Sequence, residues 1–186
     1  MITIVSGLPR SGTSLIMQML AAGGMTVLTD NERKPDADNP RGYSEWEPAK
    51  HLPKQPNLID EAEGKVVKVI SQLLLSVPEG RNYKVIFMER SLPEVLASQD
   101  EMLRRRGQSD FESHDVMTAA FKDHLSDVNA WFRNRTDISV YRLGYKQVLH
   151  DPAGTSEAIR DFLALDLNVQ AMAGQVDPSL YRKRCS

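Results

Sequence analysis

The chain has 186 residues, of which 41% are hydrophobic and 26% are charged, and this balance predicts a single soluble globular domain over residues 1–186. The formal net charge of -2 argues against bulk binding of nucleic acid, and the one cysteine, Cys185, excludes a disulfide framework. The sequence has no run of about 18 apolar residues and no basic leader, so we expect no membrane partner, no signal peptide and a cytoplasmic location.

The N-terminal segment predicts a strand, a glycine-containing turn and a helix in direct succession. Ile2–Val5 is short and β-branched, and Leu15–Ala22 is a helical run that ends at Gly23-Gly24. Between them lies the turn Gly7–Ser14. In such a corner the backbone N–H groups of the turn converge, and the helix N-terminus adds partial positive charge. The segment therefore predicts an anion-binding cradle.

The turn is similar to a P-loop, but the residue after its last glycine is different. Thr13 follows Gly12 where a nucleotide triphosphatase has lysine, and the cation lies earlier, at Arg10. We expect Arg10, Ser11, Gly12, Thr13 and Ser14 to bind a phosphate-like group. The alternative is an ordinary corner between a strand and a helix.

A long polar segment follows, from Thr29 to about Tyr43, and it ends in two glutamates, Glu45 and Glu47. Long loops in compact domains are often functional, so one acid is a candidate catalytic base, although both acids are also consistent with a solvated surface. The proline-containing stretch 53–63 predicts a connector.

Two central strands are expected to deliver cations to the same edge of a sheet. Residues 66–70 predict a strand with Lys68 near its carboxyl end, where ligands bind in open α/β sheets. The alternative for Lys68 is a strand-edge lysine with its amine in water. Tyr83–Met88 predicts a second strand, which is followed by Glu89-Arg90.

The rest of the chain continues to alternate helices and strands. Ser91 and Glu94 match a capping box for a helix that ends at Arg104–Gly107. A helix over about 114–133 and a strand over 138–141 follow, and Asp151-Pro152 opens another helix. The alternation predicts an α/β, P-loop-like three-layer fold with a mostly parallel central sheet. The histidines show no metal-ligand spacing: His51, His114, His124 and His150.

Arg90 and Ser98 form a second candidate anion site. Ser98 lies eight residues after Arg90, about two turns along the expected helix. An arginine fork and a hydroxyl at this offset suit a phosphate. The alternative is a surface ion pair beside an ordinary helical serine.

Taken together, these motifs resemble the sulfotransferases that use 3′-phosphoadenosine 5′-phosphosulfate (PAPS). The resemblance includes the P-R-S-G-T-S loop, the Arg90/Ser98 pair and the segment Tyr141–Pro152, and it covers roughly Ile2 to Leu165. It implies that the loop holds the 5′-phosphosulfate, that Arg90 and Ser98 hold the 3′-phosphate, and that Tyr145 contacts the adenine-nucleotide half.

The resemblance also has departures. Lys146 and Gln147 replace acidic residues of the family segment, and no large acceptor-binding insertion is present. Lys68 aligns with the family lysine that meets the transferring group, but the catalytic histidine that follows it in cytosolic members is missing. The loop is similar to that of the protein-tyrosine sulfotransferases, whose base is a glutamate. Glu45 or Glu47 would match that placement. Glu45 is the expected base because it precedes Trp46, whose ring would help exclude water, whereas Glu47 precedes Pro48 and is expected to begin the next helix.

The implied activity is transfer of a sulfuryl group from PAPS to a hydroxyl or amine of a small-molecule or peptide acceptor, with PAP as product and no metal. Arg10, Lys68 and Glu45 are the expected catalytic residues. One alternative is a P-loop kinase or NTPase, which would need a lysine after Gly12 and a magnesium-binding aspartate after the strand 83–88. Another is a non-catalytic nucleotide-binding module.

Overall fold

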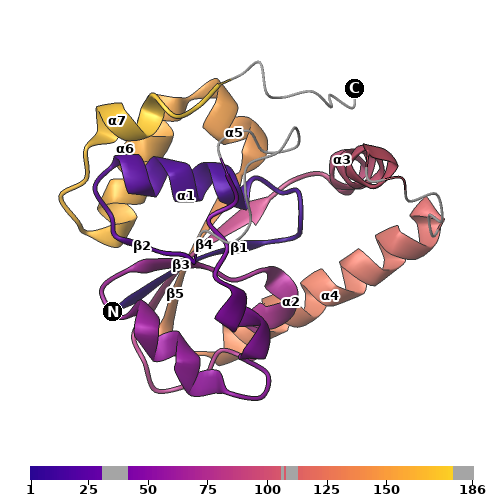
Figure 1. Ribbon diagram of the computed structural model, residues 1–186, viewed down its shortest axis with the longest axis horizontal. Helices are drawn as coiled ribbons and strands as arrows, with labels where there is room; N and C mark the ends of the chain where they lie inside the picture. Colours follow the sequence, from indigo (N-terminus) through magenta and orange to yellow (C-terminus); the bar gives the residue numbers. More distant parts are fainter. Residues whose placement is uncertain (31–41, 106, 108–112, 178–186) are drawn as a thin grey trace.

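The computed structural model describes residues 1–30, 42–105, 107 and 113–177, and Figure 1 shows a central sheet between two layers of helices. The sheet has five parallel strands in the order β2-β3-β1-β4-β5. They are β1 (Ile2–Gly7), β2 (Val27–Leu28), β3 (Val66–Lys68), β4 (Tyr83–Glu89) and β5 (Ile138–Gly144). The predicted α/β fold with a parallel sheet is confirmed, and β1 lies in the interior of the sheet, next to β4. Cys185 and most of the polar segment after Thr29 lie outside the described residues.

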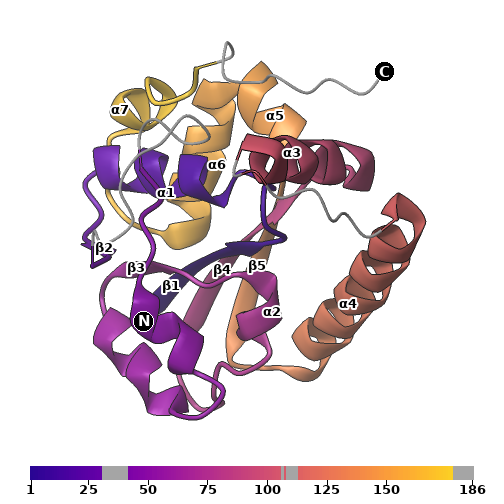
Figure 2. The same cartoon turned by 45° about the vertical axis from the view of Figure 1, so that its right-hand side comes forward.

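Each face of the sheet is covered by its own set of helices (Figures 1 and 2). One face carries α1 (Thr13–Ala22), α5 (Tyr145–His150), α6 (Pro152–Leu163) and α7 (Val169–Ala173). The other face carries α2 (Ser71–Leu74), α4 (His114–Asn134) and two 3₁₀ helices, η1 (Glu47–His51) and η2 (Pro56–Ala62). The helix α3 (Leu92–Arg105) packs on Leu8, directly after β1, and on Phe121 of α4.

The sheet is buried on both sides, which explains why its strands are nearly continuous apolar runs. All six residues of β1 are buried. Ile2 and Ile4 pack on the α4 side, whereas Val5 packs on the α1 side. Among the helices of the described residues, none has the length and apolar character needed to cross a membrane.

Several boundaries differ from the sequence-based predictions. The first helix begins at Thr13, so Thr13 and Ser14 belong to its first turn. The stretch 53–63 is largely the 3₁₀ helix η2, which buries Ile59 and Ala62 in the core, so the prediction of a plain connector was wrong. Short 3₁₀ helices escape detection because two turns are too few to establish a periodic pattern.

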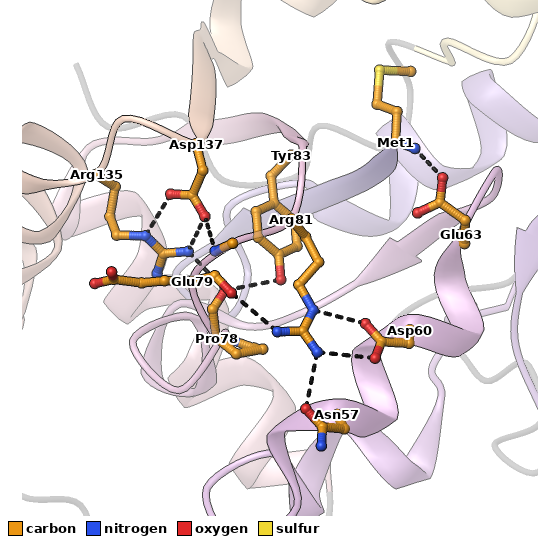
Figure 3. Close-up of polar contacts among 11 residues, drawn as sticks. Met1, Asn57, Asp60, Glu63, Pro78, Glu79, Arg81, Tyr83, Arg135 and Asp137 are labelled. Carbon is orange, nitrogen blue, oxygen red and sulfur yellow. Dashed lines mark hydrogen bonds and ion pairs between the residues drawn. The ribbon is translucent and has the colours of Figure 1, made fainter.

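A buried arginine ties the amino-terminal edge of the sheet together (Figure 3). Arg135 follows α4, and its side chain is 4% exposed. It donates to both carboxylate oxygens of Asp137 at 2.7 and 2.8 Å and to the carbonyls of Val77 and Pro78 at 2.9 and 2.8 Å. The hydrogen bonds from Arg135 lower the pKa of Asp137 to about 2. These contacts join the end of α4 to the segment that enters β4.

A second arginine–aspartate pair lies at the same edge but in solvent. Arg81 donates to both carboxylate oxygens of Asp60 at 2.9 and 3.0 Å and to Asn57 Oδ1 at 2.9 Å (Figure 3). Its side chain is 29% exposed and that of Asp60 is 52% exposed. The two pairs therefore share a geometry and differ in burial.

We expect Arg135→Met to lower the free energy of unfolding by about 3 kcal/mol, because it removes the buried hydrogen bonds from the guanidinium to Asp137 and to the carbonyls of Val77 and Pro78. Arg81→Met is the matched control, and its cost should be much smaller than that of Arg135→Met because water replaces the lost contacts. Urea denaturation of both variants measures the difference. Equal costs would show that burial of the Arg135 pair contributes nothing to stability.

Candidate functional site

The loop between β1 and α1 is shaped by glycine. Gly12 has a φ of 104°, in the left-handed region, and a Cβ atom at this position would lie 2.6 Å from Cδ2 of Tyr145. Gly7 has a φ of 150°, and its Cβ atom would lie 2.5 Å from Ser11 Oγ. Side chains at these two positions would force the loop apart, so the glycines allow the backbone to fold closely over the start of α1. The predicted strand, turn and helix are all present.

Arg10 is held in a conformation that is unusual for its residue type. Its φ is 68°, in the left-handed region, which costs a non-glycine residue roughly 1 kcal/mol or more. The guanidinium Nε donates to Ser98 Oγ at 3.0 Å. The sequence assigned Arg10 to the loop and Ser98 to a separate phosphate site. In the structure these residues are in contact, so the two candidate anion sites share Arg10.

Arg90 joins the second candidate site to the loop. It follows β4, donates from Nη1 to the carbonyl of Arg10 at 3.1 Å and from Nε to Glu94 at 3.0 Å. Its guanidinium carbon lies 4.4 Å from the centroid of the Tyr145 ring, a cation–π geometry. Burial raises the pKa of Tyr145, while Arg90 and Arg10 act in the opposite direction. Tyr145 therefore remains a neutral phenol beneath the loop.

A buried hydroxyl in the loop fits a bound anion. Ser11 is 1% exposed, and within the described residues its Oγ has no hydrogen-bond partner. Leaving a buried donor unpaired costs about 1–3 kcal/mol. The first turn of α1 contributes the hydroxyls of Thr13 and Ser14 and the N–H groups that an α-helix leaves unpaired at its start. The residues present therefore fit a phosphate or sulfate group.

Lys68 and Glu45 meet beside this cradle. Lys68 is the last residue of β3, its side chain is 5% exposed, and its Nζ lies 3.6 Å from Glu45 Oε1. The carbonyl of Tyr43 accepts hydrogen bonds from both Lys68 Nζ and Ser14 Oγ, the latter at 3.5 Å. Tyr43 thus links the lysine to the first turn of α1. The alternative of a strand-edge lysine with its amine in water is wrong.

The two glutamates of the polar segment have different surroundings. The carbonyl of Glu45 accepts from Thr29 Oγ1 at 2.8 Å, which holds the backbone while its carboxylate faces Lys68. Glu47 begins η1 as predicted and pairs with Lys50 of the same helix at 2.7 Å. Of the two acids, Glu45 is therefore the one whose carboxylate lies beside Lys68.

Three residues that the sequence did not single out for a site lie close to it. Glu94 was expected to cap a helix, but its carboxylate also pairs with Arg90 and, at 3.1 Å, with Lys146. Nε2 of His124, on α4, lies 3.0 Å from Oγ of Ser71, and Ser71 lies just beyond the carboxyl end of β3. Lys146 was visible in the sequence only as a departure from the family segment. Nothing in the sequence connects His124 to Ser71.

The topology explains why these segments meet. The connection from β1 leaves through α1 on one face, and the connection from β4 leads to α4 on the other face. Adjacent parallel strands whose connections leave in opposite directions form a crevice at their carboxyl ends, which is where α/β folds bind ligands. Arg10 and Arg90 flank this crevice.

Neither the family models nor the curated proteins with which the sequence was compared match it. The geometry of the crevice therefore carries the functional argument.

We expect the burial of His124 to make stability depend on pH. Burial lowers the pKa of His124, against the opposing charge of Asp127, so the unfolded chain takes up a proton at a higher pH than the folded chain. The free energy of unfolding should therefore fall as pH decreases from about 7 to about 5. His124→Gln should flatten that fall in urea denaturation curves, whereas the control His51→Gln, at an exposed position, should follow wild type. An unchanged slope in His124→Gln would contradict the assignment.

Proposed function

We propose that the protein is a small PAPS-dependent sulfotransferase that transfers a sulfuryl group to a hydroxyl or amine of a small-molecule or peptide acceptor. One observation carries the proposal: Arg10 joins the loop cradle to the Arg90/Ser98 pair, so two anion-binding places lie side by side. A donor with a 5′-phosphosulfate and a separate 3′-phosphate needs two such places. A nucleotide with one phosphate chain needs only one.

Different residues would bind the two anionic groups of the donor. The loop amides with Ser11, Thr13 and Ser14 would hold the 5′-phosphosulfate at the start of α1. Arg90 and Ser98 would hold the 3′-phosphate, since a guanidinium fork matches phosphate oxygens. Arg10, which joins the loop to this pair, would contact both anions. The ring of Tyr145 lies against the Arg90 guanidinium, and it would contact the adenine-nucleotide half of the donor.

PAPS, when bound, supplies an activated sulfuryl group. In-line transfer of such a group asks the protein mainly for positioning and charge stabilisation. Arg10 and Lys68 stabilise the negative charge on the oxygens around the transferring group. Glu45 would accept the proton of the acceptor, and Lys68, whose Nζ lies 3.6 Å from Glu45 Oε1, would orient its carboxylate. In this proposal Arg10 and Lys68 take the role that magnesium has in kinases. We also propose a cytoplasmic location.

Two sequence features disfavour the kinase or NTPase alternative. Thr13 occupies the place of the P-loop lysine, and β4 is followed by Arg90 rather than by a magnesium-binding aspartate. The non-catalytic alternative keeps the cradle without chemistry, and detection of sulfuryl transfer separates it from the proposal.

We expect PAP to bind without magnesium and more tightly than ATP or 5′-AMP, because it alone has phosphates for both places. Isothermal titration calorimetry with PAP, ATP, GTP and 5′-AMP, with and without magnesium, measures this. Arg90→Ala should lower PAP affinity by about 2 kcal/mol, roughly 30-fold. Ser98→Ala keeps the Arg90–Glu94 pair intact and should weaken PAP more than 5′-AMP. Equal affinity of the wild type for PAP and 5′-AMP would contradict the assignment of Arg90 and Ser98 to the 3′-phosphate.

We expect Glu45→Gln to reduce turnover by roughly a hundredfold or more while PAP affinity stays nearly unchanged, because the change removes basicity and keeps shape. The assay is PAP release from PAPS with an acceptor selected from hydroxyl and amine compounds. Glu47→Gln is the matched control and should retain turnover. Full activity of Glu45→Gln would move the assignment away from Glu45.

A further inference from the structure

A lysine lies at the solvent side of the Arg90 site, held by the same carboxylate. Glu94 is 1% exposed in its side chain, and each of its oxygens serves a different cation. Oε2 accepts from Arg90 Nε at 3.0 Å, and Oε1 lies 3.1 Å from Lys146 Nζ. Lys146 belongs to the first turn of α5, directly after Tyr145, whose ring supports Arg90. The two cations therefore reach one carboxylate from two separate elements.

Positive charge gathers in this group. Arg90 and Lys146 both pair with the carboxylate of Glu94, and Arg90 also contacts the carbonyl of Arg10, so these contacts link three cations. Cations that are brought together in a partly buried place attract multivalent anions. A phosphate monoester carries close to two negative charges at neutral pH, so it is the kind of group that such cations attract.

Arg90 and Lys146 also differ in how far they are exposed to solvent. The side chain of Arg90 is 8% exposed, whereas that of Lys146 is 57% exposed. A lysine side chain is flexible, so its ammonium at the entrance of a site can stay in contact with an anion that is bound to a more buried guanidinium. Glu94 limits where that stem ends, because its Oε1 keeps the ammonium beside Arg90.

We propose that Lys146 is a third cation of the Arg90/Ser98 subsite, positioned there by Glu94, and that it determines the preference for a nucleotide with a separate phosphate monoester. The inference deepens the proposed function and rests on it. It assigns a specificity-determining role to a residue that departs from the family segment.

The test compares PAP with 5′-AMP, which lacks the second phosphate. Lys146→Gln should weaken PAP about tenfold and leave 5′-AMP within about twofold, so that the ratio of the two affinities collapses. Lys146→Arg should retain the preference, because it keeps the cation. The effect of Lys146→Gln should shrink between about 50 and about 500 mM NaCl, since an exposed charge is screened.

Lys50→Gln is the matched control. Lys50 is likewise exposed, at 65%, and paired with a glutamate at 2.7 Å, but its partner is Glu47 on η1. Lys50→Gln should change neither the affinity for PAP nor that for 5′-AMP. If Lys146 served only to neutralise Glu94, Lys146→Gln would lower the melting temperature and weaken PAP and 5′-AMP equally, and that result would overturn the inference.

Glu94→Gln tests the positioning role. If only the net charge mattered, Glu94→Gln would tighten PAP binding, because it removes a negative charge. Positioning predicts weaker PAP binding with little change for 5′-AMP, because Lys146 loses its anchor. Tighter binding would overturn the role of Glu94.

The proposed function and this inference fail in different ways. A wild type with no preference for PAP over 5′-AMP contradicts both. A wild type that prefers PAP, with the same preference in Lys146→Gln, contradicts the inference and leaves the proposed function standing.

Discussion

The guanidinium of Arg90 holds four segments of the chain at one point. It contacts the carbonyl of Arg10 in the loop after β1, the carboxylate of Glu94 on α3 and the ring of Tyr145 on α5, while its own backbone directly follows β4. A buried guanidinium cannot lose its charge, so each of these partners must be present for it to stay there. The shape of the crevice follows from satisfying this one cation.

The local parts of the site could be predicted from the sequence. A β-branched run, two glycines and a helical run are each coded within a few residues, so they predicted the cradle Gly7–Ser14. The rule that parallel strands present their carboxyl ends at one edge placed Lys68 and Arg90 near it. These inferences depend on chain direction and periodicity, which a sequence displays directly.

The pairings within the site could not be predicted in the same way. Glu94 matched a capping pattern, which gave it a local role and concealed its contacts with Arg90 and with Lys146, a residue from another part of the chain. Arg10 was assigned to the loop alone, although its side chain reaches Ser98 on α3. Contacts between side chains that are distant in sequence depend on how the layers pack, and no periodic pattern records them.

The position of β1 in the sheet has a consequence for how the molecule opens. This strand is paired on both sides and covered on both faces, so its backbone amides should exchange with solvent only when the whole fold opens. The cradle begins at the last residue of that strand. Fraying of the short edge strand β2 or of the small helix α7 would leave it intact, so the cradle is among the last parts of the molecule to be lost as the fold opens.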